Sequence, residues 1–183
     1  MTAFRFIHCS DLHIDSPFKG LASQMPSLAE RLRESTFQAF NNIVKLALEE
    51  KVDAVLIAGD IFDGEDRSLQ AQLKFHRGLL ELSQAGIPAF IVHGNHDPSN
   101  SWSHTLDWPE HTTIFPGNKV ERHPVIKNGK TQAWIYGISY PQKEVNENLA
   151  SRCKKDQEQG FAIGLLHANV GQQPGHDNYA PCS

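Results

Sequence analysis

Four apolar segments of this sequence each end in a cluster of polar residues, and this regularity limits the fold more than any other feature. The segments cover residues 4–8, 54–58, 89–92 and 161–166. The polar residues after them are Asp11 and His13, Gly59-Asp60 with Asp63, Gly94-Asn95-His96-Asp97, and His167. Short apolar runs of this kind predict buried strands. Sites in open α/β sheets form at the carboxyl ends of strands, so we expect the four clusters to meet at one sheet edge.

Two amphipathic helices are predicted between the first three of these strands. Ser27 and Glu30 have the spacing of a capping box, so the first helix should begin there and run to about Lys51. Its predicted buried stripe is Leu28, Leu32, Phe40, Val44 and Ala47. The second helix should cover residues 68–85 before Gly86, with an apolar side made of Leu69, Leu73, Leu79, Leu80 and Leu82. Strands that alternate with helices predict parallel pairing with right-handed crossovers.

The second half of the sequence has a different pattern, made of shorter strands. Strands are predicted over residues 113–115, 120–126 and 133–140, and Asn128-Gly129 is a hairpin turn signal between the last two. A weak helix is predicted over residues 144–155, before the strand at 161–166. The expected fold class is therefore α/β, with a mixed sheet or two stacked sheets and helices outside them.

Composition excludes several classes of protein. The 183 residues are 39% apolar and 21% charged, which suits one ordinary domain and excludes a disordered chain. The apolar runs are too short to span a bilayer, so no membrane partner is expected. The formal charge of −4 means that nucleic acid must be contacted locally or with help from another protein. Cys9, Cys153 and Cys182 form no CxxC pair, which predicts free thiols in the cytoplasm.

The chemistry of the four clusters indicates a pair of metal ions. Their side chains are carboxylates, imidazoles and one carboxamide, a donor set that suits Mn, Fe or Zn. One metal ion cannot use so many donors, whereas two ions about 3.5–4 Å apart that share a carboxylate can. Single residues also have other interpretations. A structural role for Asp63, at the start of a turn or as a loop brace, is as good an explanation as a role in the site, and His8 and His93 suit the core better than a ligand role.

The ordered set of motifs resembles that of the calcineurin-type metallophosphoesterases. Within that superfamily the sequence is similar to the bacterial DNA-repair nuclease group typified by SbcD, and most of all to its YhaO-type exonuclease subgroup. The matching segments are residues 8–18, 58–63, 87–98, 164–167 and 176–181. The resemblance implies an α/β/β/α sandwich of two mixed sheets flanked by helices, with a site for two divalent metal ions at the sheet ends. Manganese is the expected metal, with iron or zinc as alternatives.

The resemblance also implies a set of metal ligands. On the matching positions, Asp11 and His13 would bind the first ion, and Asp60 would bridge both ions. Asn95 and His167 would bind the second ion.

Two further residues have catalytic roles in the resemblance. His96 would face the scissile phosphate and assist the leaving group, and Asp97 would orient His96. The family also has a Gly-His-x-His motif that supplies one ligand to each ion, and no such motif follows Phe161 in this sequence. We therefore expect residues 1–183 to be the N-terminal part of one nuclease domain with an incomplete second sheet. The rest of the domain and any DNA-binding region would lie beyond, and the fragment alone would be inactive.

The resemblance favours one function over two others. It implies metal-dependent hydrolysis of DNA, as an exonuclease or endonuclease in repair, beside an SbcC-like ATPase partner, and it leaves room for a homodimer. A phosphatase or cyclic-nucleotide phosphodiesterase that acts on a small phosphoester is the alternative, and a mildly acidic surface suits it slightly better. A binding module that kept only the fold is the third interpretation, and the intact motifs weigh against it.

Overall fold

Two sheets form the centre of the molecule in the computed structural model, which describes residues 3–64, 67–101, 107–156, 160–171 and 179–182. The first sheet has the parallel order β1-β2-β3-β4, made of Phe6–Cys9, Ala54–Ala58, Ala89–Val92 and Thr112–Ile114. The second has the order β5-β6-β7, made of Glu121–Lys127, Lys130–Gly137 and Phe161–Leu165. In it β5 pairs antiparallel with β6, while β6 pairs parallel with β7. Asn169–Val170 (β8) and Pro181–Cys182 (β9) form a small third pair.

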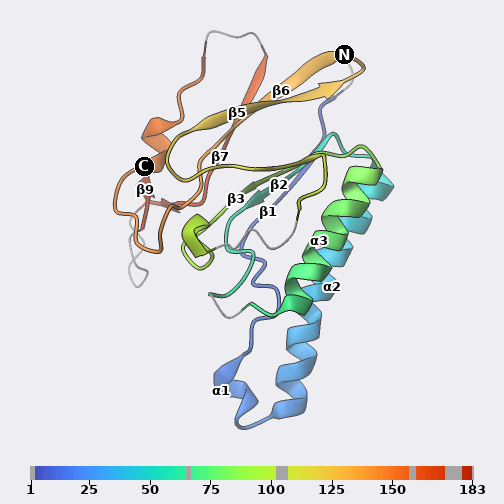
Figure 1. Cartoon of the computed structure of the whole chain (residues 1–183), viewed down its shortest axis with the longest axis vertical. Helices are drawn as coiled ribbons and strands as arrows, with labels where there is room; N and C mark the ends of the chain where they lie inside the picture. The colour runs from blue at the N-terminus through green and yellow to red at the C-terminus, as the bar shows by residue number, and fades with distance from the viewer. Residues whose placement is uncertain (1–2, 65–66, 102–106, 157–159, 172–178, 183) are drawn as a thin grey trace.

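The layers follow from the alternation of side chains along the strands. Helices α2 (Pro26–Glu50) and α3 (Leu69–Gln84) lie side by side along the first sheet, and the second sheet lies on the opposite side of it (Figure 1). Val55 and Ile57 of β2 pack in one core with the helices. Leu56 of the same strand packs in a second core with β5, β6 and β7. The predicted α/β class with two stacked sheets and outer helices is confirmed, and β2 is buried on both faces as its composition predicts.

The start of α2 differs from the prediction. The helix begins at Pro26, and its N-cap residue, Met25, makes no side-chain cap hydrogen bond, so the capping box at Ser27 and Glu30 is wrong. Proline suits the first helical turn because its missing N–H would have no intrahelical acceptor there. The helix ends at Glu50 with Lys51 as C-cap, as expected.

The buried faces of both helices are also shifted from the predicted ones. The buried residues of α2 are Ala29, Phe37, Phe40, Val44 and Ala47. Leu28 and Leu32 fall on the N-terminal half of α2, which extends past α3 and the sheet and lies beside the short helix α1 (Lys19–Ala22) (Figure 1). The buried residues of α3 are Ala71, Phe75, Gly78, Leu79 and Leu82. Leu79 and Leu82 are buried as predicted, whereas Leu69, Leu73 and Leu80 are exposed, because Phe75 and Gly78 complete the packing face.

The helix predicted over residues 144–155 is wrong. Only one 3-10 turn, η2 (Leu149–Arg152), forms there, and a second such turn, η1, covers Ser99–Ser101. The Asn148 side chain accepts a hydrogen bond from the Ser151 amide, so it starts a turn where a longer helix would need to continue. Within the ranges given above, no helix combines the length and apolar character needed to cross a membrane.

Candidate metal centre

The polar clusters at the strand ends meet around one cavity, as the sequence predicts. The cavity has a volume of about 560 Å³. It is lined by side chains from the ends of β1, β2, β3 and β7: Asp11, His13, Asp60, Asn95, His96 and His167. Tyr140, Ala168, Asn169, Val170 and Tyr179 complete its lining.

The loops after β1 and β2 run side by side and bring the first two clusters together. The amide of Asp11 donates to the Gly59 carbonyl at 3.1 Å, and the amide of His13 donates to the Asp60 carbonyl at 3.0 Å. Asp11, His13 and Asp60 all have positive φ angles, of 54°, 41° and 52°. Such backbone conformations are costly for residues other than glycine and gather at functional sites. The hydrogen bonds between the two loops therefore hold these three residues in strained backbone conformations, which fixes the positions of their side chains.

Two glycines allow the loops to approach this closely. A Cβ at position 94 would lie 2.1 Å from Asp60 Oδ1, and one at position 59 would lie 2.8 Å from His167 Nδ1. Gly59 also has a φ of 84°, which a side chain would oppose. The glycine before each cluster is thus needed to leave room for the Asp60 and His167 side chains.

Asp60 is the central carboxylate of the cavity. Its Oδ2 lies 3.9 Å from His13 Nε2 and 3.5 Å from His167 Nε2, while its Oδ1 accepts a hydrogen bond from the His96 amide at 3.0 Å. The side chain is only 5% exposed. Donor atoms on one metal ion lie about 3–3.6 Å apart when each is about 2.1 Å from the ion. One Asp60 oxygen is therefore placed between two imidazole nitrogens at spacings close to those of shared metal ligands.

The ring of His167 is oriented for a metal ligand. Its Nδ1 lies 2.8 Å from the Ala58 carbonyl oxygen, to which only a protonated nitrogen can donate. In the neutral ring this leaves the lone pair on Nε2, which faces Asp60. A backbone carbonyl that fixes the tautomer in this way is a common outer contact of metal-binding histidines.

These donors fit two metal ions that share Asp60. Ligand atoms of Asp11, His13 and Asp60 all lie within 4.8 Å of one another. Asn95 and His167 line the same cavity from the ends of β3 and β7. The two sets are the ones that the sequence predicts, and their role as ligands stays a prediction.

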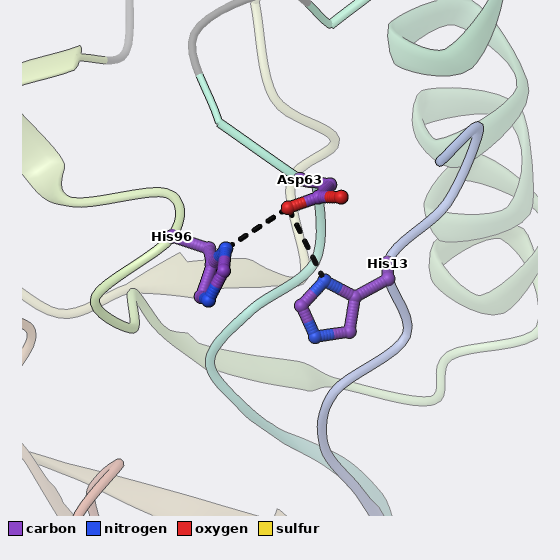
Figure 2. A group of neighbouring side chains, drawn as sticks. All are labelled: His13, Asp63 and His96. Atoms are coloured by element: carbon purple, nitrogen blue, oxygen red, sulfur yellow. Dashed lines mark hydrogen bonds and ion pairs between the residues drawn. The ribbon is translucent and has the colours of Figure 1, made fainter. Parts of the chain in front are cut away.

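A second group of side chains lies beside the first and includes His96 (Figure 2). His96 Nδ1 is 2.9 Å from Asp63 Oδ1, and His13 Nδ1 is 4.0 Å from the same oxygen. Partial burial favours a higher pKa for Asp63, but hydrogen bonds from Ser16 and His96 hold that pKa below its usual value. Asp63 is therefore the carboxylate that contacts the His96 imidazole, a role that sequence reasoning missed. The GDxxD spacing was the only signal for it, and that spacing also fits a turn residue.

Asp97 has a different set of contacts from the one predicted. Its carboxylate accepts hydrogen bonds from the amides of Asp60, Ile61 and Gly94 at 3.1, 2.9 and 2.9 Å. The side chain is fully buried, and this burial raises its pKa to about 6. In the described structure Asp97 thus ties the loops after β2 and β3 together, while Asp63 makes the contact with the His96 ring.

Two other side chains near the cavity have environments that the sequence does not reveal. Tyr140 lines the cavity with its ring centroid 5.6 Å from that of His167, and burial raises the pKa of its hydroxyl. His93 is buried, which lowers its pKa to about 3, so it stays neutral in the core. The predicted match around residues 176–178 lies outside the described residues.

The family model for calcineurin-like phosphoesterases matches residues 4–180. The chain belongs to that family. As a calcineurin-like phosphoesterase it is 38% identical over 181 residues to the metallophosphoesterase YhaO of Bacillus subtilis, an overlap that covers 99% of this chain and 44% of YhaO. The predicted resemblance to the SbcD-like group and its YhaO-type subgroup is confirmed.

Two other relatives are named for DNA repair and for nuclease activity. The chain is 28% identical over 181 residues to the DNA double-strand break repair protein Mre11 of Sulfurisphaera tokodaii, covering 93% of this chain and 42% of Mre11. It is 31% identical over 94 residues to SbcD of the nuclease SbcCD of Escherichia coli K12, covering 51% of this chain and 21% of SbcD. The chain thus spans less than half the length of these relatives.

Proposed function

We propose that the protein hydrolyses phosphodiester bonds in DNA with two divalent metal ions. The observation that carries the proposal is the position of the Asp60 carboxylate between His13 Nε2 and His167 Nε2, in a cavity that the His96 imidazole also lines. Asp11 and His13 form one set with Asp60, and Asn95 and His167 form the other. A phosphodiester needs charge neutralised on its phosphoryl oxygens and a proton for its leaving oxygen, and the cavity offers groups for both.

Manganese is the metal that we propose for this donor set. Carboxylate, imidazole and carboxamide donors without a thiolate suit Mn, with Fe or Zn as alternatives. When bound, two such ions would neutralise phosphoryl charge and lower the pKa of the attacking water.

We propose that His96 donates a proton to the leaving oxygen. In this step a water that has released a proton to solvent forms the new bond to phosphorus as the bond to the leaving ester oxygen breaks. That oxygen takes a proton from His96, and His96 regains a proton from solvent. Nδ1 of His96 lies against Asp63, so Nε2 points away from the carboxylate and is the nitrogen left to donate (Figure 2). Asp63 Oδ1 lies 2.9 Å from His96 Nδ1, where a carboxylate stabilises the protonated form of the ring that the step requires.

The names of the relatives support DNA as the substrate. Mre11 and SbcD are named for DNA repair and nuclease activity. The net charge of −4 gives no general attraction to a polyanion, so we propose that an SbcC-like ATPase partner helps to hold DNA. A homodimer and a cytoplasmic location complete the proposal, and the three free cysteines support a reducing compartment.

We also propose that further ligands come from outside residues 1–183. Each donor set holds three side chains when Asp60 is counted in both, which leaves room for another ligand on each ion. The chain spans 44% of YhaO, so a longer protein has sequence to supply them. The test is metal content and hydrolysis by residues 1–183 beside the full-length protein in Mn²⁺. We expect weak metal binding and no hydrolysis from the shorter chain, and equal turnover by both would contradict this.

A small phosphoester is the second candidate substrate, because the mildly acidic chain lacks the basic excess of many DNA-binding proteins. Three substrates separate the two functions in the full-length protein with Mn²⁺: end-labelled duplex DNA, 4-nitrophenyl phosphate and a cyclic nucleotide. We expect DNA to be shortened from its ends, with loss of activity in EDTA and recovery on adding Mn²⁺. Hydrolysis of the monoester or the cyclic nucleotide with intact DNA would favour the alternative. No hydrolysis of any substrate by metal-loaded protein would favour a binding module.

A further inference from the structure

Ser16 contacts Asp63 on the side opposite His96. The Ser16 hydroxyl donates to Asp63 Oδ2 at 3.0 Å, while Asp63 Oδ1 lies 2.9 Å from His96 Nδ1. The three side chains thus form a chain of contacts that ends at an imidazole in the cavity wall. We propose that Ser16 is a positioning residue, which holds the Asp63 carboxylate in the orientation that serves His96. This inference rests on the proposed role of His96 in hydrolysis.

Asp63 needs such a contact because two imidazoles compete for the same oxygen. Oδ1 lies 2.9 Å from His96 Nδ1 and 4.0 Å from His13 Nδ1, and the two rings stand edge to face with centroids 5.1 Å apart (Figure 2). The Asp63 side chain is 37% exposed, so packing alone does not fix its rotamer. A hydrogen bond to Oδ2 fixes the plane of the carboxylate and therefore decides which ring Oδ1 meets.

Ser16 itself is held by its own loop. Its amide donates to the His13 carbonyl at 3.1 Å, which closes a tight turn directly after the predicted ligand. The preceding Asp15 is a buried residue whose carboxylate accepts hydrogen bonds from Arg33 on α2 and Ser68 at the start of α3. The Asp15 amide donates to Thr36 Oγ1 at 3.0 Å. Two helices therefore anchor the loop that carries the Ser16 hydroxyl.

The hydroxyl also lies at the border of a second cavity. That cavity, of about 550 Å³, is lined by Ser16, Asp63 and Gly64 with residues of the loop, α2 and the start of α3. Asp63 thus lines this second cavity and contacts His96, which lines the first cavity. Water in the second cavity would compete with the Ser16 hydroxyl for Asp63 Oδ2. A fixed hydroxyl replaces that water, so removal of the hydroxyl should loosen Asp63 without disturbing the core.

The test compares Ser16→Ala with Ser16→Thr, which keeps a hydroxyl, in the full-length manganese-loaded protein. Ser35→Ala is the matched control, because that exposed hydroxyl bonds only within its own helix, to the Arg31 carbonyl at 2.8 Å. The substrates are a dinucleotide, whose leaving alkoxide needs a proton, and bis(4-nitrophenyl) phosphate, whose leaving group needs little help. For Ser16→Ala we expect kcat on the dinucleotide to fall about 3- to 30-fold, with a smaller fall on the nitrophenyl diester. KM and metal content should not change, and Ser16→Thr and Ser35→Ala should behave like wild type.

A second measurement is independent of hydrolysis. In metal-free protein with ¹⁵N-labelled histidine, the His96 Nδ1–H signal is assigned by its loss in His96→Ala. We expect Ser16→Ala to broaden or remove this signal through faster exchange with water, and Ser35→Ala to leave it unchanged. An unchanged signal in Ser16→Ala, equal losses on both substrates, or loss of metal would overturn the inference. If the signal responds while wild type cleaves neither diester, the positioning contact stands and the proposed function fails.

Discussion

Asp60 is the single side chain on which both donor sets depend. Its Oδ2 faces His13 Nε2 at 3.9 Å and His167 Nε2 at 3.5 Å, and its Oδ1 is bound by the His96 amide. We predict that Asp60→Ala in the full-length protein removes most of both metal ions and reduces hydrolysis to background, because each ion loses a charged ligand. Elemental analysis of the purified variant measures this directly.

The control for that experiment is a carboxylate far from the cavity. Asp156 forms an ion pair with Arg122 at 2.7 Å and is not part of the cavity lining. Asp156→Ala should keep the metal content and activity of wild type. Two ions per chain in Asp60→Ala would exclude the bridging role.

A substitution of His96 should separate catalysis from metal binding. Because its ring nitrogen contacts Asp63 and not Asp60, we predict that His96→Ala keeps both metals and lowers kcat on DNA about 10²- to 10⁴-fold. The exposed His111 offers a matched control, and His111→Ala should have no effect. Loss of metal together with activity in His96→Ala would make His96 a ligand instead.

Sequence could predict the residues of the cavity that directly follow a strand. Asp60 and Asn95 follow the buried strands β2 and β3. Asp11, His13 and His167 follow β1 and β7, which are more exposed than predicted, and β7 belongs to the second sheet. The strand ends nevertheless meet at one cavity. The partner of His96 was not predictable in this way. Asp97 is its neighbour in sequence, but full burial turns that carboxylate toward three backbone amides. Asp63 reaches the ring from another loop, and only the folded structure shows that approach.

At the scale of elements, α2 and α3 approach each other closely at a glycine. A Cβ at position 78 of α3 would lie 2.5 Å from Phe40 and 3.1 Å from Val44, both on α2. We predict that Gly78→Ala lowers the free energy of unfolding by about 1–3 kcal/mol, because the overlap outweighs the gain of about 1 kcal/mol in helix propensity. Urea unfolding followed by circular dichroism measures the difference.

Gly20 in α1 provides the matched glycine. A Cβ there would meet no atom within 4 Å, so Gly20→Ala should be neutral or slightly stabilising. Equal effects at both positions would show that helix propensity and not packing decides the result at position 78.

Glycine contacts of this kind explain why element boundaries were easier to predict than buried faces. The ends of α3 follow local rules: Ser68 caps its start through the Ala71 amide, and Gly86 follows its end with a φ of 71°. Its packing face depends on α2 as well, where Phe40 fills the space over Gly78. The pattern of leucines carries no information about that partner, so it predicted Leu79 and Leu82 correctly but missed Phe75 and Gly78.

At the scale of the molecule, a buried carboxylate links the two sheets at the end of β2 that is opposite Asp60. Asp53 precedes β2, and its Oδ2 accepts the amide of Arg5 at 2.8 Å, just before β1. Its Oδ1 is bound by the ammonium group of Lys127 at the end of β5 in the second sheet. Sequence alone predicted two stacked sheets but not this link, because its three members are separated by long stretches of chain.

The Asp53 link should make stability depend on pH in a defined direction. Burial favours a higher pKa for Asp53, but the Lys127 ammonium and the Arg5 amide outweigh it and lower the pKa. A carboxylate whose pKa is lower in the folded state contributes stability above its unfolded pKa of about 3.9, and this contribution is lost as pH falls through the folded value. We predict that Asp53→Asn lowers the free energy of unfolding by about 1–3 kcal/mol at pH 7. The difference from wild type should shrink below about pH 4, where the wild-type carboxyl also takes up a proton.

Urea unfolding at pH 7, 5 and 3, followed by tryptophan fluorescence, tests both the size and the direction of this effect. Glu50→Gln is the matched control, because Glu50 pairs with the Arg5 side chain at 3.3 Å while both groups are more than half exposed. Such a surface pair contributes little, so its removal should change stability by less than about 0.5 kcal/mol at every pH. If the loss of unfolding free energy in Asp53→Asn is the same at pH 7 and pH 3, packing and not the charge of Asp53 links the sheets there. If the loss of unfolding free energy becomes smaller as the pH falls, the charged Asp53 carboxylate links the two sheets, at the end of β2 away from the cavity.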